Sequence, residues 1–541
     1  MQHCDGVGKL RVADGRQTIP FWPVFPLIFL AVLIAHWPLL RLPYYWDEAG
    51  YYIPAAYDFF RTGSLIPFST LSNAHPPLPS IYLTVWWKLF GFSPFATRIA
   101  VCFTASIALA AVWKLALTTT ARQSVAFATV VLTALYPIFF AQSSLAHADV
   151  FAAAATLWAV ALLLKRTPST LAWSVLCFVL AALCKETAIV TPLALGLWEA
   201  RTRTAASLRR AAMLLTSVLP LACWYLYHRY KTNFIFGNPE YLRYNAGATL
   251  TPLRILLAFG HRVLHVTAHM NLFVPVLFML ACMLLDAKKE SDGTERPRIS
   301  FPDQAIFYVI IVANVLLFSV LGGALLTRYL LPLYPLIILL CVNTFRRRLT
   351  QWPALVAFSA AAFVAGLFVN PPYRFAPEDN LAYADVIRLH QQAIAQIVQH
   401  SPHSTVLTAW PATDELQKPE LGYVTQPIAV AAIDNFSYTQ IQRAAQLPET
   451  YTTGLIFSTK YDPPHLPFSL GRKNETLDAR FFDFHHDLSP QLIARLLDGN
   501  VVWREERKGQ WTAVLHFNRA IEAQIVPSAP TSLFAKGLGV R

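Results

Sequence analysis

The chain has 541 residues, of which 55% are hydrophobic and only 14% are charged, and it carries a formal net charge of +13. Soluble domains have about 25% charged residues, so this composition excludes an ordinary soluble enzyme and is typical of a polytopic membrane protein. The excess of lysine and arginine is expected for the cytoplasmic loops of such a protein. Because the basic residues are dispersed among apolar segments, the charge does not indicate nucleic-acid binding.

Apolar segments of helix length follow one another from residue 21 to residue 369. They reach about 16–24 residues, which suits helices that cross a bilayer. The segments are 21–42, 77–92, 95–118, 124–142, 150–164, 170–184, 187–199, 211–229, 254–285, 304–326, 329–345 and 352–369.

The basic residues between these segments indicate which of them cross the membrane, because lysine and arginine collect in short cytoplasmic loops. If every segment crosses, the basic loops after the second segment all lie outside. If 77–92 does not cross, all the basic loops lie inside. We therefore predict about eleven transmembrane helices, with 77–92 as an interfacial helix on the outer side, where Trp86, Trp87 and Lys88 fit well.

Two further features refine this topology. Segments 170–184 and 187–199 are short and nearly continuous, which predicts a tight hairpin with an outward tip. Segment 254–285 is long enough to be tilted or broken. The resulting divisions are a cytoplasmic N-terminus at 1–20, a transmembrane domain at 21–370 with its first outer loop at 43–94, and an outer domain at 371–541.

The composition changes after Asn370, where "PPYRFAPEDN" is typical of a turn-rich linker. Beyond it, "ADVIRLHQQAIAQIVQH" has helical periodicity, and "STVLTAW", "GLIFST" and "WTAVLHF" are typical of strands. The predicted fold is therefore a polytopic α-helical membrane protein with a C-terminal soluble α/β domain.

In this topology, polar residues collect on the outer side of the membrane. They are Asp47 and Glu48 in "YYWDEAGYY", His75 in "NAHPPLPS", His147 and Asp149 in "AHADVF", Lys185 and Glu186 in "CKETA", and Arg328 and Tyr329 in "TRYLLPLYP". Each has a simpler interpretation as a helix cap, a turn residue, a local ion pair or an interfacial anchor. Such local roles give no reason for a one-sided cluster, and a charge in a spanning helix costs about 2.5–3.5 kcal/mol. The cluster therefore predicts a polar cavity open to the outer side.

Five of these motifs, in this order, resemble the GT-C glycosyltransferases, and more narrowly their protein O-mannosyltransferase and aminoarabinose (lipid A) transferase branch. They are "WDEAGYY", "HPPL", the Ala-x-x-Asp at 146–149, "KET" and "RYLLPLYP". The resemblance covers roughly residues 20–370. It implies a GT-C fold, a polyprenyl-phosphate-linked sugar donor, and transfer on the outer face with inversion at the anomeric carbon. Where this branch has a lysine before Pro-Pro, the chain has His75, a titratable cation in place of a permanent one.

An acceptor hydroxyl loses a proton as it attacks the anomeric carbon, and a nearby carboxylate can accept that proton. By the resemblance, Asp47 is expected to be this base, while Glu48 or Asp149 orients the acceptor or binds the sugar. Which of the two adjacent carboxylates, Asp47 or Glu48, takes the proton is open from the sequence.

The leaving phosphate gains negative charge during transfer, so cations beside it are expected. Lys185 and Arg328 suit this role, with His75 as a hydrogen-bond donor. The remaining residues expected to bind substrate are Glu186, Tyr329, Tyr52 and His147.

The sequence thus predicts an integral-membrane glycosyltransferase of a bacterial inner (plasma) membrane. Its expected partners are membrane lipid, the polyprenyl-phosphate-linked sugar, and a glycolipid, polysaccharide or protein acceptor. A single displacement needs no cofactor, and the scattered cysteines, without a Cys-x-x-Cys pair, do not indicate a metal site. A transporter or flippase for lipid-linked sugars is the alternative, although it would need polar groups distributed through the bilayer. A catalytically inactive binding scaffold is a third possibility.

Overall fold

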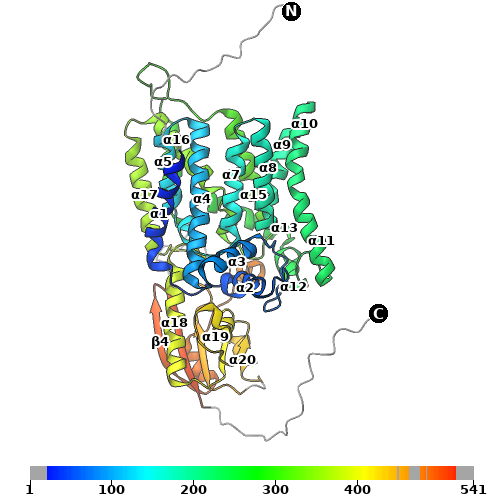
Figure 1. Ribbon diagram of the computed structural model, residues 1–541. Coiled ribbons are helices and arrows are strands. Elements are labelled where there is room, and N and C mark those ends of the chain that lie inside the picture. Colours follow the sequence, from blue (N-terminus) through cyan, green and yellow to red (C-terminus); the bar gives the residue numbers. More distant parts are fainter. Residues whose placement is uncertain (1–20, 448–449, 462, 464–474, 483, 519–541) are drawn as a thin grey trace, which may run out of the picture.

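The computed structural model describes residues 21–518, apart from 448–449, 462, 464–474 and 483. A bundle of helices takes up the chain as far as residue 368, and a smaller domain with a five-stranded sheet lies at one end of it (Figure 1). Helices α2 and α3 lie at this same end of the bundle. The predicted cytoplasmic N-terminus, residues 1–20, lies outside the described residues.

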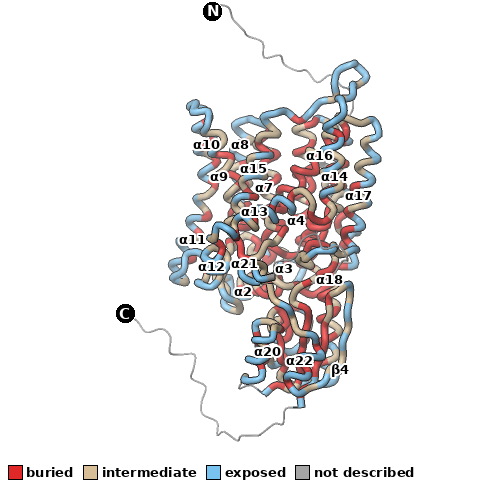
Figure 2. Tube along the Cα trace, turned by 180° about the vertical axis from the view of Figure 1, so that it is seen from behind, coloured by how far each residue is buried: buried red, intermediate tan, exposed pale blue. Residues whose placement is uncertain are grey.

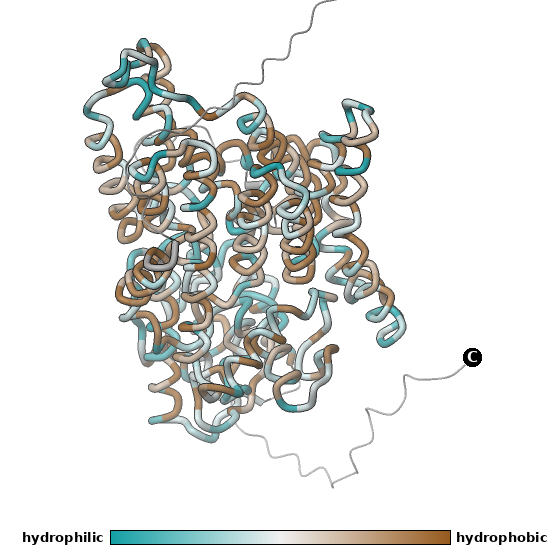
Figure 3. Tube along the Cα trace, turned by 45° about the horizontal axis from the view of Figure 1, so that its top comes forward, coloured by the Kyte–Doolittle hydropathy of each residue, from teal (hydrophilic) through white to brown (hydrophobic). Residues whose placement is uncertain are grey.

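Every predicted apolar segment coincides with a helix or a broken helix of the bundle. The helices are α1 (Phe21–His36), α2 (Ile53–Thr62), α3 (Leu78–Phe90), α4 (Pro94–Thr120), α5 (Gln123–Leu135), α6 (Pro137–Gln142), α7 (Ala148–Leu163), α8 (Pro168–Cys184), α9 (Val190–Ala200), α10 (Ala205–Leu215), α11 (Leu219–Thr232), α12 (Pro239–Asn245), α13 (Pro252–Thr267), α14 (Phe273–Met283), α15 (Phe301–Val320), α16 (Tyr334–Arg348) and α17 (Trp352–Phe368). Figure 3 shows that hydrophobic residues, coloured brown, recur along the helices of the bundle.

Among the described helices, three stretches are long and apolar enough to cross a membrane: α4, the run 205–232 through α10 and α11, and α15. A fourth is the pair α13–α14, which is bent by 98° and matches the predicted broken segment. Five more apolar helices are shorter, at 10–17 residues. The number of crossings, eleven, stays a prediction.

Local sequence explains two of the breaks. Tyr136 precedes Pro137 and is extended, with ψ 123°, because proline disfavours the helical conformation in the residue before it; this ends α5. Met270 has a positive φ of 48°, which separates α13 from α14. Tyr136 OH donates to His269 O at 3.2 Å, so the two breaks lie beside each other.

The C-terminal domain is built on a mixed sheet with strand order β2-β1-β3-β5-β4, in which β1 is parallel to β2 and β3 while β5 is antiparallel to β3 and β4. Its elements are α18 (Ala382–His400), β1 (Val406–Ala409), α19 (Ala412–Gln417), β2 (Val430–Ile433), α20 (Tyr438–Ala444), β3 (Thr453–Phe457), α21 (Glu475–Phe482), α22 (Pro490–Leu496), β4 (Gly499–Arg507) and β5 (Gln510–Phe517). The predicted helix and three predicted strands correspond to α18, β1, β3 and β5. Strands β2 and β4 were not predicted: β2 is a short apolar segment of four residues, and β4 ends in the charged run "REER".

The bundle and the C-terminal domain share buried contacts, and the first outer loop lies between them. Tyr44 N donates to Leu421 O at 3.3 Å, and Tyr423 OH donates to Tyr44 O at 2.9 Å. An apolar cluster that includes Tyr45 and Tyr383 joins both parts, and Figure 2 shows buried chain continuing from one into the other. The loop that carries the acidic pair is therefore held by both parts of the molecule.

Candidate active site

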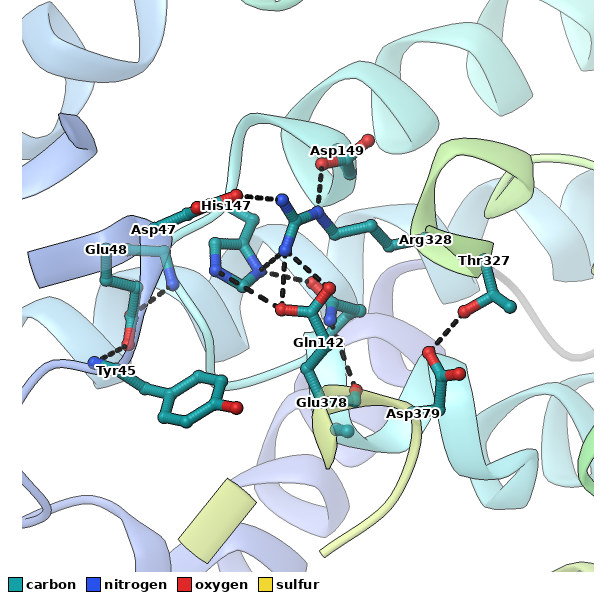
Figure 4. A network of polar contacts seen from close by, with 12 residues as sticks. Tyr45, Asp47, Glu48, Gln142, His147, Asp149, Thr327, Arg328, Glu378 and Asp379 are labelled. Carbon is teal, nitrogen blue, oxygen red and sulfur yellow. Dashed lines mark hydrogen bonds and ion pairs between the residues drawn. The ribbon is translucent and has the colours of Figure 1, made fainter. Parts of the chain in front are cut away.

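Arg328 stands at the centre of a buried ionic network (Figure 4). It lies in the short 3₁₀ helix Thr327–Leu330 between α15 and α16, and its side chain is only 2% exposed. Its guanidinium contacts Asp47 and both carboxylate oxygens of Glu378, and its Nε lies 3.2 Å from Asp149 Oδ2. Removing a charge from water costs several kcal/mol, and the three carboxylates offset that cost.

Lys185 is the second cation of the site. It follows the last residue of α8, and its ammonium donates to Asp149 in the first turn of α7. The ammonium also lies 3.9 Å from the centre of the Tyr329 ring, a cation–π distance. Asp149 thus joins the two cations, and three elements far apart in the sequence meet at this carboxylate.

The two adjacent acids of the first outer loop have different surroundings. Asp47 is 22% exposed and lines a cavity. Glu48 is fully buried and is paired with Arg98 on α4, with Nη2–Oε2 at 3.3 Å. It also accepts backbone hydrogen bonds from Tyr45 and Ala146. Both oxygens of Glu48 are thus already bonded, and Glu48 does not line the cavity. Of the two acids, the structure brings only Asp47 into the site.

His75, Glu186 and Tyr52 form a second group along the same cavity. His75 Nδ1 lies 3.2 Å from Glu186 Oε2, and the imidazole stacks on Tyr52 with ring centres 5.4 Å apart. Burial opposes ionisation of Glu186, but the charges of His75 and Lys185 and the hydrogen bond to His75 outweigh it and hold the pKa of Glu186 at about 2. Glu186 is therefore ionised at neutral pH and pairs with His75.

His147 is buried beside this group and does not line the cavity. Its Nδ1 lies 2.8 Å from Gln142 Oε1, and its Nε2 lies 3.9 Å from Glu378. Burial, followed by the charges of Arg328, Lys185 and Arg98, lowers the pKa of His147 well below its ordinary value. His147 is therefore neutral, and it contacts the network through Glu378 without lining the cavity.

A cavity of about 1980 Å³ passes in front of the network. The predicted site residues that line it are Asp47, Tyr52, His75, Lys185, Glu186, Arg328 and Tyr329, whereas Glu48, His147 and Asp149 do not. Toward the bundle its wall is apolar, with Leu193 of α9, Leu264 of α13 and Leu317 of α15. Toward the C-terminal domain it is lined by side chains such as Trp410 and Asn435. Asp47, Lys185 and Arg328 therefore share one cavity with an apolar wall from the bundle and with side chains of the C-terminal domain.

Comparisons with known proteins agree with this architecture. Residues 74–229 match the model of the dolichyl-phosphate-mannose-protein mannosyltransferase family. Matching crystal structures include ArnT from Cupriavidus metallidurans in the apo state, with a TM-score of 0.52 and 14% identity over 92% of this chain and 98% of that one. The same protein bound to undecaprenyl phosphate matches with a TM-score of 0.54 and 15% identity, over 91% and 98% of the two chains. The chain has an ArnT-like fold.

This ArnT-like fold confirms the resemblance and the fold class predicted from the sequence. The family match covers part of the bundle, and the structural match extends over the bundle and the C-terminal domain alike. The apolar helices are those of a multi-pass membrane protein. No curated protein sequence matches the chain.

Two acids at the site of this ArnT-like fold were not predicted from the sequence. Glu378 and Asp379 follow α17 in "PPYRFAPEDN", which was interpreted only as a linker, and both are buried. Asp379 accepts from Thr327, and its Oδ2 lies 2.9 Å from His269 Nε2 at the bend between α13 and α14. The available signal was two adjacent acids directly after the last apolar segment, on the predicted outer side.

Glu378 has an unusual ionisation. Burial is the main cause that raises the pKa of Glu378, to about 8. The charge of Arg328 lowers this pKa, whereas the charges of Asp47, Asp379 and Asp149 raise it further. A carboxyl with this pKa exchanges its proton close to neutral pH. Arg328 Nη1 donates to both carboxylate oxygens of Glu378, which makes Glu378 part of the candidate site.

Two arginines on α13 hold the segment that leads to Arg328. Arg262 Nη1 donates to Leu326 O at 2.8 Å, and its Nε donates to Phe318 O at 3.1 Å. Arg254, which lies about two helical turns before Arg262 and is also buried, donates to Ser319 O at 3.3 Å. The sequence shows the spacing of these arginines, but their carbonyl partners depend on tertiary packing.

Among the described residues, no three histidine, cysteine or carboxylate side chains are arranged to hold a metal ion. The expectation of a metal-independent reaction stays a prediction.

Proposed function

We propose that the protein is a membrane glycosyltransferase that moves a sugar from a polyprenyl-phosphate-linked donor to an acceptor hydroxyl. The observation that carries this proposal is the position of Asp47, a carboxylate that binds Arg328 and lines the same cavity as Arg328 and Lys185. The mannosyltransferase family match and the ArnT-like fold support it, and one of the ArnT structures holds undecaprenyl phosphate.

The apolar wall and the charged residues of the cavity suit a donor with a lipid tail and a charged head. The apolar wall of α9, α13 and α15 matches a polyprenyl chain, and the phosphate would lie against Lys185 and Arg328. In the structure without donor, Arg328 is already bonded to three carboxylates. Adding a phosphate to this cluster is favourable only if one carboxylate becomes neutral, and Glu378, with its pKa of about 8, is the group that gains a proton most readily.

The reaction we propose is a single displacement. The acceptor oxygen forms a bond to the anomeric carbon while the bond from that carbon to the phosphate oxygen breaks, and the bonding electrons leave with the phosphate. The acceptor proton passes to the carboxylate of Asp47. Arg328 and Lys185 stabilise the negative charge that develops on the phosphate. Attack on the face opposite the phosphate inverts the anomeric configuration.

Of the three predicted catalytic acids, Asp47 is favoured as the base because it alone lines the cavity. Asp149 bonds both cations and would fix their positions. Glu48 is occupied by Arg98 and two backbone amides, which suits a structural role in holding the loop.

The orientation in the membrane belongs to the same proposal. The site lies at the end of the bundle that carries the C-terminal domain, and the distribution of basic loops favours the outer side of the membrane for this end. We place the site on the outer face of a bacterial inner membrane. The collection of charges at one end also favours transfer over transport, which would require polar groups along a path through the bundle.

Mass spectrometry of envelope glycolipids and glycoproteins tests the proposed function. Cells that express the wild-type protein should carry a sugar on one envelope fraction that cells with Asp47→Asn lack, at equal protein levels. An identical sugar pattern in the two strains would contradict the proposal. A flippase would be favoured instead by a different pair of results. The Asp47→Asn strain would accumulate the lipid-linked sugar on the cytoplasmic side, and the purified wild-type protein would not consume that sugar.

A further inference from the structure

Trp410 of the C-terminal domain reaches the first outer loop of the bundle. It follows β1 directly, and its ring centre lies 5.1 Å from that of Trp46 and 5.9 Å from that of Tyr51. All three rings line the cavity, and all three are only partly buried. Each residue therefore keeps part of its surface exposed where a ligand in the cavity could reach it.

The contact between Trp410 and the loop depends on Gly50. A Cβ atom at this position would lie 2.7 Å from the Trp410 ring, closer than real contacts allow, so any other residue would displace the ring. Gly50 belongs to the π-helix Glu48–Tyr52, whose N-terminal neighbour is Asp47. The Trp410 ring therefore packs on a residue that lies within one helical turn of Asp47, the proposed base.

Polar groups of the same domain complete this part of the cavity. Asp434 and Asn435 follow strand β2 and lie on the cavity wall together with Trp410. The leucines of the apolar wall come instead from α9, α13 and α15 of the bundle. The bundle and the C-terminal domain thus offer donor and acceptor different walls of one cavity that also holds Asp47.

We propose that Trp46, Tyr51 and Trp410 form the acceptor subsite and that the acceptor presents a carbohydrate ring there. The proposal rests on the proposed function, which it deepens by naming the acceptor class. The apolar face of a sugar ring packs against aromatic faces, while its hydroxyl groups bond to carboxylates and amides such as those of Asp434 and Asn435. A peptide acceptor would instead be recognised chiefly through backbone hydrogen bonds, which ring faces do not supply.

Binding of soluble sugars to the full chain in nanodiscs, without donor, tests this subsite separately from catalysis. The probes are neutral trisaccharides of glucose, mannose and N-acetylglucosamine, together with a Ser/Thr-rich peptide, and saturation-transfer NMR is the readout. We expect transfer to the ring protons of at least one trisaccharide. Trp410→Ala should weaken its binding by up to about tenfold, the effect of losing one aromatic partner, and Trp410→Phe should restore part of it.

Trp503→Ala is the matched control, because Trp503 is a partly buried tryptophan of β4 in the same domain and does not line the cavity. It should bind the trisaccharide as the wild type does. If Trp410→Ala does not fold, Tyr51→Ala tests the opposite side of the subsite and should also weaken binding.

Three results would overturn the proposed subsite. They are no saturation transfer to any trisaccharide, saturation transfer to the peptide alone, and equal trisaccharide binding by the wild type and the folded ring variants. Undecaprenyl phosphate binding is measured on the same samples. We expect the wild type and Trp410→Ala to bind this lipid equally well. A wild-type protein that does not bind the lipid would count against the proposed function, and the sugar-binding result would still test the subsite.

Discussion

Two buried arginines bind the two acids of one dipeptide, and their surroundings differ. Arg98 pairs with Glu48 and donates to the carbonyl oxygens of Leu42, Pro43 and Ser144, so that one positive charge meets one negative charge away from the cavity. Arg328 meets Asp47 together with two further carboxylates beside a large cavity. A balanced, closed pair suits a structural role, whereas an excess of negative charge at a cavity suits a site where charge changes.

Arg328→Lys should have the largest effect on activity. Lysine has one point charge and cannot reproduce the planar contacts that Arg328 makes to three carboxylates. We expect transfer to fall by about 100-fold or more, comparable to the loss of a donor that stabilises transition-state charge. Transfer is measured with a radiolabelled lipid-linked sugar and compared at equal amounts of folded protein. Retention of most of the activity would show that Arg328 serves chiefly to hold the fold.

Glu48→Ala should act on stability instead. It leaves Arg98 buried without its carboxylate, a change that costs about 3–5 kcal/mol for buried pairs. A lower unfolding temperature is therefore expected, measured by thermal denaturation in detergent. The fraction that remains folded should transfer sugar at close to the wild-type rate. A folded but inactive Glu48→Ala protein would contradict the distinction between the two arginines.

The pH dependence of donor-lipid binding should expose Glu378. Its pKa of about 8 lies above that of the unfolded chain, so the folded protein holds a proton that the unfolded chain has released, and this stabilisation is lost as the pH rises toward 8. The charged and titratable groups that face Glu378 are Arg328, His147, Asp47, Asp149 and Asp379. A phosphate monoester has its second pKa at about 6 and is largely ionised at pH 7, so it adds little further titration above that pH.

Binding of undecaprenyl phosphate should accordingly weaken as the pH rises from 7 to 9. Glu378→Gln, which is neutral at all pH values, should remove much of this dependence and bind more tightly at pH 9, by up to about tenfold. Glu415→Gln is the matched control, because Glu415 is a buried glutamate paired with His390 in the C-terminal domain. An unchanged pH profile in Glu378→Gln would assign the titration to another group.

His75→Lys should have the smallest effect. It restores the cation that the resembling branch has before Pro-Pro, and it can keep the ion pair with Glu186, which is ionised because its pKa is about 2. A change of about twofold to fivefold in the Michaelis constant for the donor is expected, consistent with a partly exposed ion pair. A change of 100-fold would indicate direct contact between His75 and the reacting groups.

Sequence reasoning located the elements and the side of the bundle on which Asp47, Lys185 and Arg328 lie. Hydrophobic segments and the distribution of basic loops are properties of the chain itself, and they require no knowledge of packing. The pairing of Glu48 with Arg98 could not be derived in this way, because a single arginine in an apolar helix has no identifiable partner until the helices are packed.

The contributions of the C-terminal domain were also beyond the sequence. Glu378 lies in what looked like a linker, and Trp410 lies at the end of a predicted strand, with nothing local to connect either to Asp47. Both connections depend on how the domain sits against the bundle. The one local signal, two acids immediately after the last apolar segment, could have been combined with the predicted topology to suggest Glu378 and Asp379 as site residues.

The most direct test of the account is Asp47→Asn in the purified full-length protein, with sugar transfer and undecaprenyl phosphate binding measured on the same sample. The account predicts a folded protein that binds the lipid and transfers sugar about 10²–10⁴-fold more slowly, as expected for loss of a general base. Transfer at the wild-type rate would contradict the assignment of Asp47 as the base.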